Sequence, residues 1–443
     1  MSENSKKLNL FDLISIGVGS VIGAGIFSML GSGYAMTGRS IATALIFAMF
    51  LVFMQTIRQL FMSSMFALDG GMYAQQALIL PPVLTGMSSI ILVMSNLSFS
   101  VFGISIASYL TQLIPALAPY QTIIGVLVLT LFFGLSISGS KGMAKVQNVM
   151  ALVMYAALAL FVVMGLINRD PASYAGEPYF ISSSGSFLMA IAIMSFTCNG
   201  ASNLLNLTGD AKNPKKNIPL GFFLTTVVCA LIYFLLGTAF GSAGSYSELA
   251  GQNLGFVAQK VMPHALYLFF IIGGAIFALT TSLLGGVAAM KFPILASAED
   301  GWLPKVFTLK TKKGFPYVIM GFMYLLAVVP VLGGFTLDSI VSFILVPGMI
   351  LGVVCNLFSL KLPKQFPEAW KNAGLHCPYW LYVVAIIVSI FASLFTAVFS
   401  LMSLNTVGII GNLSLTAAMF VYAWWRHKKG YVKLVSVQDV KDE

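Results

Sequence analysis

Long apolar runs dominate the chain, and short polar or Pro/Gly-rich stretches separate them. A helix needs roughly 20 mostly apolar residues to cross a bilayer, and about twelve runs reach or approach that length. We therefore expect an all-α membrane protein of about twelve transmembrane helices. The expected spans are 11–37, 39–62, 83–113, 120–138, 144–168, 185–209, 218–241, 262–290, 316–333, 337–361, 379–401 and 404–425.

Two of these runs are interrupted near the middle. The first span carries Gly19, Gly23 and Gly25 within ISIGVGSVIGAGIFS, and the sixth carries Asn199 and Gly200 within SFTCNGASNLLNLTGD. Glycine weakens a helix and lets other groups approach its backbone. Interruptions at corresponding places in spans one and six are what two five-helix inverted repeats produce. The alternatives are a GxxxG helix-packing face for the first interruption and a kinked, pore-lining helix for the second.

Composition supports residence in a membrane. Hydrophobic residues make up 58% of the 443 positions and charged residues 9%, and the mean hydropathy of +0.92 lies outside the range of soluble globular proteins. The first span follows a short polar leader without a cleavage site, so it is expected to be retained. We predict one membrane domain over 1–443, with a leader (1–10), repeat one (11–168), repeat two (185–361), helices 11 and 12 (376–426) and a tail (427–443).

The net charge of +10 does not indicate a nucleic-acid surface, because the basic residues are concentrated in the loops on one side of the membrane. With a cytoplasmic N-terminus, only Arg39, Arg169 and Lys260 of the 24 lysines and arginines fall outside. This bias follows the positive-inside rule. We expect a multi-pass protein of the cell membrane with both termini in the cytoplasm, in contact with lipid and not with nucleic acid. Whether a partner subunit binds does not follow from the sequence.

The interruptions predict a substrate site made of main-chain groups. The second half of span one begins near Gly25, and its free N–H groups and helix dipole favour an anion at the bilayer centre. The first half of span one ends near Val21 and Ile22 and leaves unpaired carbonyl groups. The first half of span six does the same near Phe196 and Thr197. A substrate carboxylate suits the amides and a substrate ammonium suits the carbonyls, so an α-amino acid is the expected substrate.

The placement of the acids narrows the substrate class. All 14 fall at span ends or in loops, and a second cation on the substrate would be costly without a carboxylate partner. A small neutral amino acid is therefore expected, carried by exchange or with sodium rather than through a proton relay. In a carrier of amines or organic cations, Asn199, Asn203 and aromatic faces would replace that carboxylate.

Two other function classes are less consistent with the sequence. An ion channel or a purely structural partner membrane protein is a third hypothesis, which saturable, trans-stimulated transport would exclude. An enzyme is not expected, because the three histidines lie at span ends or in loops and no nucleophile–base pair can be traced. The four cysteines lack the spacing of a metal site or a disulfide framework. No cofactor is expected, apart from a candidate sodium ion.

Several motifs resemble a known superfamily. The segment GVGSVIGAGIFS is similar to a glycine-rich substrate loop of the form G-S-G-I-F, with Ala24 in the serine position. The segments at 206–219 (NLTGDAKNPKKNIP) and 296–307 (ASAEDGWLPKVF) are similar to the end of span six and to the loop after span eight; ALDGGMYA (67–74) and SKGMAKVQNVM (140–150) are weaker matches. Over nearly its whole length the chain resembles the amino acid–polyamine–organocation transporters, and among them the permeases related to the L-type amino acid exchangers.

The resemblance implies a five-plus-five inverted repeat of the LeuT type followed by two further helices. It also implies alternating access around a central site between spans one and six. Carried over by position, the carboxylate would lie at Gly23, Ala24, Gly25 and Ile26, and the amino group at Val21 and Phe196.

The resemblance also assigns supporting roles. Phe196 would be a gating aromatic, and Tyr233 the tyrosine of span seven that steadies the loop of span one. Thr281 and Ser282 resemble the hydroxyl pair that sodium-coupled carriers of this fold use. Sodium-independent relatives often place a lysine in span five, where this chain has Met154. This departure puts the lysine-supported mechanism in doubt.

Overall fold

The computed structural model describes residues 7–66, 68, 71–138, 141–174, 178–181, 183–312 and 314–437. Some predictions fall on positions outside the described residues. These are most of the leader (1–6), the end of the tail (438–443), Lys313, Ala67, Asp69 and Gly70 of the segment at 67–74, and Ser140 of the segment at 140–150.

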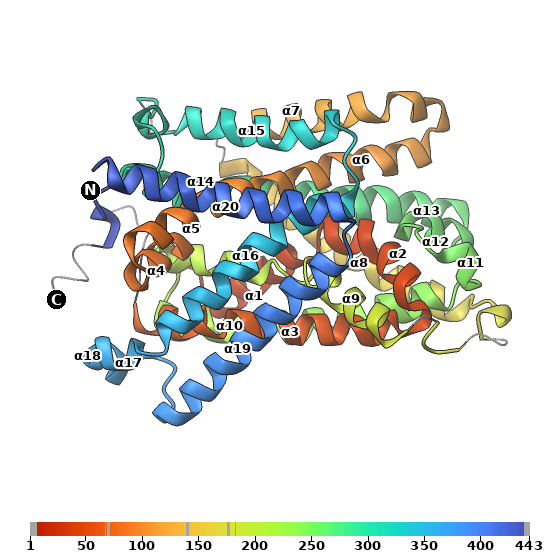
Figure 1. Ribbon diagram of the computed structural model, residues 1–443. Coiled ribbons are helices and arrows are strands. Elements are labelled where there is room, and N and C mark those ends of the chain that lie inside the picture. Colours follow the sequence, from red (N-terminus) through yellow and green to blue (C-terminus); the bar gives the residue numbers. More distant parts are fainter. Residues whose placement is uncertain are drawn as a thin grey trace.

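The described residues form a helical bundle without strands, as expected (Figure 1). The helices before the second break are α1 (Leu10–Val21), α2 (Ala24–Thr37), α3 (Ile41–Met65), α4 (Gly71–Ile79), α5 (Pro82–Met94), α6 (Phe99–Leu113), α7 (Gln121–Ser138), α8 (Lys141–Ile167) and α9 (Ser184–Met194). The later elements are the 3₁₀ helix η5 (Ala201–Asp210), then α10 (Pro214–Gly241), α11 (Tyr246–Leu249), α12 (Leu254–Val261), α13 (His264–Phe269), α14 (Phe277–Glu299), α15 (Tyr317–Leu332), α16 (Leu337–Ser359), α17 (Leu362–Gln365), α18 (Pro367–Lys371), α19 (Tyr379–Met402) and α20 (Thr406–Lys428).

Every expected span falls on helical structure. Within the described part of the chain, nine helical segments are long and apolar enough to cross a membrane, and one of them, Ala24–Met65, contains parts of two expected spans. The helices α1, α9 and α15 are apolar but shorter. The number of twelve spans and the division into two repeats stay predictions.

Both predicted interruptions are breaks in the helices. α1 ends at Val21 and α2 begins at Ala24; α9 ends at Met194, and the chain continues through a turn into η5. The second half of span six is thus a 3₁₀ helix rather than an α-helix. Span eight also differs from expectation, because it contains a π-helical turn at Phe270–Ile276 and continues beyond 290 to Glu299.

Local sequence accounts for several helix starts. The side chain of Asn9 accepts from the N–H of Asp12, and the side chain of Asp12 accepts from the N–H of Asn9, so a capping box begins α1. The side chain of Asn253 accepts from the N–H of Phe256 and caps α12, and the side chain of Asn405 accepts from the N–H of Gly408 and caps α20. The capping box fixes where α1 starts, and α1 then packs along α10, which also packs against α3.

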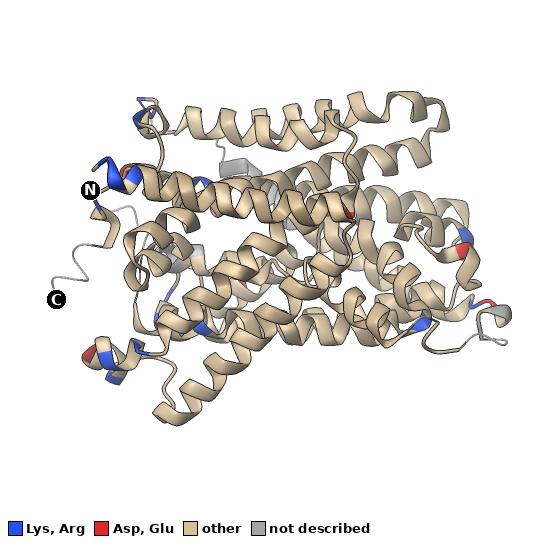
Figure 2. Ribbon diagram, viewed as in Figure 1, with Lys and Arg blue, Asp and Glu red and all other residues tan. Residues whose placement is uncertain are grey.

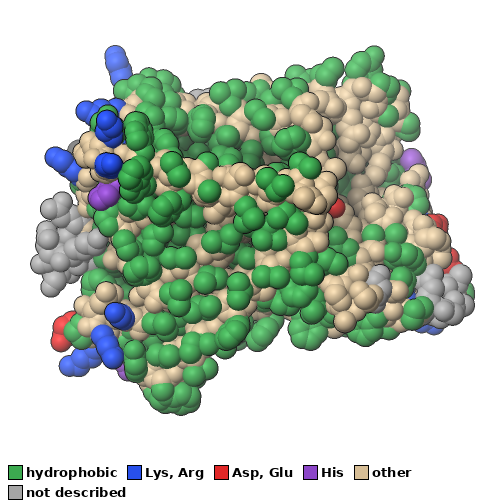
Figure 3. Space-filling model, viewed as in Figure 1, with side chains coloured by type: hydrophobic (Ala, Val, Ile, Leu, Met, Phe, Trp, Pro, Cys, Tyr) green, Lys and Arg blue, Asp and Glu red, His purple; other side chains and the backbone are tan. Residues whose placement is uncertain are grey.

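Charged side chains lie mainly at the two ends of the bundle (Figure 2). Lysines and arginines gather at the end that carries both termini, while hydrophobic side chains cover the middle (Figure 3). At the opposite end Lys260 pairs with Asp170 (3.4 Å) and Glu248 (2.5 Å). The arrangement is that of an integral membrane protein with an apolar belt.

Candidate functional site

The first break leaves free main-chain donors at the start of α2. Gly23 precedes α2 in a non-helical conformation (φ −154°, ψ −146°) and provides no side-chain cap. Within the described part of the chain, the N–H groups of residues 23–26 donate no hydrogen bond to the protein. The amide dipoles of α2 concentrate partial positive charge at these groups. An anionic group of a ligand is therefore favoured here.

The second break lies directly against the first. After α9, the N–H groups of residues 196–199 donate to the carbonyls three positions earlier, which tightens the turn. A Cβ atom at Gly200 would lie 2.2 Å from the carbonyl oxygen of Ser20, and one at Gly25 would lie 2.6 Å from the Cα atom of Thr197. Backbone meets backbone at both points, so these two positions require glycine.

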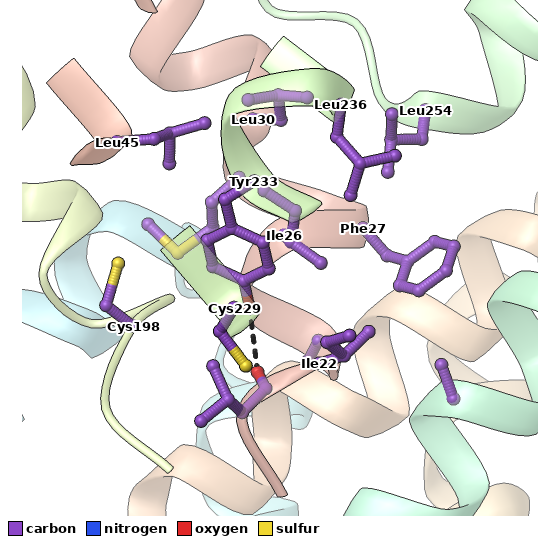
Figure 4. Packing of buried hydrophobic residues seen from close by; sticks show 14 of the residues in the cluster. Ile22, Ile26, Phe27, Leu30, Leu45, Cys198, Cys229, Tyr233, Leu236 and Leu254 are labelled. Atoms are coloured by element: carbon purple, nitrogen blue, oxygen red, sulfur yellow. Dashed lines mark hydrogen bonds between the residues drawn. The ribbon is translucent and has the colours of Figure 1, made fainter. Parts of the chain in front are cut away.

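Tyr233 of α10 joins the two breaks. Its hydroxyl lies 2.9 Å from the carbonyl oxygen of Val21 and 2.9 Å from that of Thr197. The side chain is fully buried, with Ile26 and Cys229 beside it (Figure 4). The hydroxyl carries one proton, so it is shared between the two carbonyls. The structure thus places Tyr233 where the resemblance put a residue that steadies the loop of span one.

The predicted carbonyl acceptors already have one protein partner each. Val21 accepts from Tyr233, and Phe196 accepts from the N–H of Asn199 (3.2 Å). The carbonyl oxygen of Ile22 lies 3.2 Å from the hydroxyl of Ser282. A carbonyl oxygen has two lone pairs, so each can accept one further hydrogen bond from a ligand.

A cavity of about 290 Å³ opens beside the two breaks. The predicted residues that line it are Val21, Gly23, Ala24, Gly25, Phe196, Thr197, Asn199, Asn203 and Ser282. The other predicted residues do not line it: Ile22, Ile26, Met154, Tyr233 and Thr281 are buried behind the wall. The side chains of Ile22 and Met154 belong to one hydrophobic cluster, so Met154 fills core space where the resemblance expects a lysine.

The rest of the cavity wall was not predicted. Most of it comes from α3, α4, α5, α6, α14, α16 and the 3₁₀ helix η2 (Ser95–Ser98), and it includes Gln59, Met72, Gln76 and Ser88. None of the lining residues carries a charge. The amide side chains of Gln59 and Gln76 near the ends of apolar runs were the available signal, but only the tertiary structure brings them to the breaks.

One part of the cavity wall, α4, lies toward the end of the bundle that carries both termini (Figure 1). Toward the opposite end, hydrogen bonds hold α2 against the segment that follows α10. The hydroxyl of Tyr246 donates to the carbonyl of Ala35 (2.6 Å), and the N–H of Gly251 donates to the carbonyl of Gly31 (3.0 Å).

Oxygen atoms also converge at the end of α1. The hydroxyl of Ser282 lies 3.2 Å from the carbonyl oxygens of Gly19 and Ile22, and the hydroxyl of Thr281 lies 3.1 Å from that of Ala278. Carbonyl groups at broken helix ends are used for sodium in transporters of this architecture. The two hydroxyls of the predicted pair therefore differ in these contacts: that of Ser282 bonds to carbonyls of α1, and that of Thr281 bonds to a carbonyl of its own helix.

A second, larger cavity of about 520 Å³ lies between α1, α8 and α10. Its lining is almost entirely apolar, with residues such as Phe11, Leu158 and Ile232. It offers little to the charged groups of an amino acid. The cavity beside the breaks is therefore the candidate substrate site.

Comparison with known proteins agrees with the geometry. The sequence profile of the amino acid permease family matches residues 8–424. The chain is similar to the branched-chain amino acid permease BcaP of Bacillus subtilis, with 20% identity over 84% of each chain. It is also similar to the human large neutral amino acids transporter small subunit 2, with 23% identity over 96% of this chain and 81% of that protein. The vacuolar cationic amino acid transporter 4 of Arabidopsis thaliana is 26% identical over 69% of this chain and 54% of that protein.

Proposed function

The chain belongs to the amino acid permease family, and from this premise we propose that it carries small neutral amino acids across the cell membrane by alternating access, as an exchanger. The observation that carries this proposal is the set of amides at residues 23–25, which have no hydrogen-bond acceptor among the described residues and belong to residues that line an uncharged cavity. These amides would bind the substrate carboxylate. The second lone pairs of the Val21 and Phe196 carbonyls would bind the ammonium group.

A neutral side chain on the substrate is proposed because the cavity wall carries no charge. The lining offers amide and hydroxyl groups, such as Asn199 and Ser202, and no carboxylate. A third charge on the substrate would lose its hydration without gaining a partner, at a cost on the order of several kcal/mol. Two of the similar proteins are named for branched-chain and large neutral amino acids, and a third for cationic ones. The uncharged wall favours the first two.

Exchange is the proposed coupling because none of the described residues that line the cavity is an acid that could relay protons. In this proposal, the arrangement in which Tyr246 holds α2 and α4 forms part of the cavity wall would be one of the two states that alternating access requires. The cytoplasm lies on the side of α4 in this proposal, since lysines and arginines gather at that end. Both termini would then be cytoplasmic.

Counterflow in proteoliposomes tests the proposal. Vesicles loaded with unlabelled alanine, serine or leucine should accumulate the labelled amino acid transiently, with saturation and trans-stimulation. Vesicles without internal substrate should show slow uptake. The absence of counterflow for every neutral amino acid would refute the proposal, and competition by polyamines but not by amino acids would favour a carrier of amines or organic cations.

A sodium-coupled symporter is the second candidate. The contacts of Ser282 with the carbonyls of Gly19 and Ile22 favour it, because those oxygens could bind a sodium ion once the hydroxyl turns its lone pair inward. An inward sodium gradient should then drive uptake into empty vesicles. Equal uptake with sodium and with potassium or choline would reject this candidate in favour of exchange.

A further inference from the structure

The segment after α20 folds back over the end of α14. Arg426, in the last turn of α20, donates through Nη2 to the carbonyl oxygen of Gly301 (2.7 Å). Further along, the N–H of Lys433 donates to the carbonyl oxygen of Asp300 (2.9 Å). Gly301 has a φ of +88°, and a Cβ atom there would lie 2.1 Å from the carbonyl oxygen of Tyr431. The segment therefore rests directly on the loop that follows α14.

The carboxylate of Asp300 is the centre of this contact and is 1% exposed. Ser436 donates to it twice, from its N–H to Oδ1 (2.9 Å) and from its hydroxyl to Oδ2 (2.7 Å). Tyr73 of α4 donates its hydroxyl to Oδ2 (2.6 Å). No basic side chain of the described residues forms an ion pair with this carboxylate. Because a buried carboxylate without partners is costly, these three donors hold three segments together.

One of those segments is a wall of the substrate cavity. Tyr73 lies between Met72 and Gln76 on α4, and both of these line the cavity. Burial raises the pKa of Tyr73 well above its ordinary value, so its hydroxyl stays protonated and donates. The short helix η8 (Val435–Val437) contacts both α4 and α14, and Val437 is buried.

We propose that residues 431–437 form a C-terminal clasp that fastens α4, and with it one wall of the cavity, to the end of α14, with Asp300 as the positioning residue. The C-terminal segment would thus hold in place a wall of the cavity without lining the cavity itself. The kinetic consequence rests on the proposed transport function; the structural consequence does not.

The rate at which a cysteine on the cavity wall is chemically modified reports whether the clasp holds that wall. This measurement does not depend on transport. The probe is Met72→Cys in a protein that also carries Cys377→Ser, because the other three cysteines are buried. Its modification by a charged, membrane-impermeant thiol reagent is timed in vesicles that expose the tail. Ser436→Ala, which removes a hydrogen bond to a carboxylate, should speed modification about tenfold.

Two matched variants complete the test. Lys433→Ala should leave the modification rate unchanged, because Lys433 contributes its main-chain N–H to Asp300. Ser436→Thr keeps a hydroxyl and should restore the slow rate. In transport, Ser436→Ala should change the half-saturating substrate concentration on the tail side and leave that on the opposite side unchanged.

Equal modification rates for the unaltered tail, Ser436→Ala and a chain ending after Gly430, all eluting as folded protein, would overturn the clasp. Equal effects of Lys433→Ala and Ser436→Ala would do so as well. A protein that transports no amino acid but shows modification dependent on Ser436 would refute the proposed function and support the clasp.

Discussion

Replacing Tyr233 with phenylalanine removes a hydroxyl group that connects both helix breaks. The ring would stay in its buried place, while the carbonyl oxygens of Val21 and Thr197 would lose their common donor at 2.9 Å. The two carbonyls would then face each other without a proton between them. We expect the breaks to lose their relative position, and the substrate site with them.

The expected fall in kcat/KM depends on the loss of one proton, that of the Tyr233 hydroxyl. One buried hydrogen bond is lost and an acceptor is left unsatisfied, which costs about 1 to 3 kcal/mol. A free-energy difference of about 1.4 kcal/mol is tenfold in an equilibrium constant. Since the proton is shared between two carbonyls rather than added to each, we expect kcat/KM to fall about tenfold.

The assay is counterflow of a neutral amino acid in proteoliposomes with equal amounts of each protein. Tyr382→Phe is the matched control, because the Tyr382 hydroxyl is also buried and also donates to a main-chain carbonyl, that of Ser359 (2.7 Å), away from the breaks. The control should lose stability without a selective loss of kcat/KM. Equal kcat/KM for Tyr233→Phe and the unaltered protein, or equal losses in both variants, would refute the reasoning.

Three further predictions concern the same architecture. Gly200→Ala places a methyl group 2.2 Å from a carbonyl oxygen and should abolish transport and destabilise the fold by about 1 to 3 kcal/mol, whereas Gly321→Ala, with open space around it, should be neutral in thermal unfolding and uptake. Ser282→Ala should reduce transport several-fold, and any stimulation of uptake by sodium should disappear with it; persistence of that stimulation would exclude Ser282 as a ligand. Lys260→Ala should change the free energy of unfolding by less than about 1 kcal/mol, because its ion pairs are partly exposed; a larger loss in a denaturation experiment would contradict this.

The helices and both breaks were predictable because they depend on local composition. Apolar runs set the spans, and Gly23 and Gly200 interrupt two of them. The close approach of Gly200 to Ser20 was not visible, since it depends on how two helices far apart in the sequence meet. The 3₁₀ form of η5 was also missed, because spacing alone does not distinguish it from an α-helix.

The candidate site was predictable in its main-chain part and not in its side-chain part. Tyr233 and Ser282 were named from a resemblance, and the structure places both in contact with the end of α1. Gln59 and Gln76 reach the cavity from helices that carry no motif for it. Ser436 was beyond prediction, because its partner Asp300 lies far away in the sequence.

The central claim is that main-chain groups at the two breaks bind both charges of an amino acid, and competition for counterflow tests it most directly. Leucine should compete with labelled leucine, while leucine amide, which lacks the carboxylate, and 4-methylpentanoic acid, which lacks the ammonium group, should each compete at least about tenfold more weakly. Undiminished competition by either analogue would contradict the claim, because one of the two sets of main-chain groups would then contribute nothing to binding.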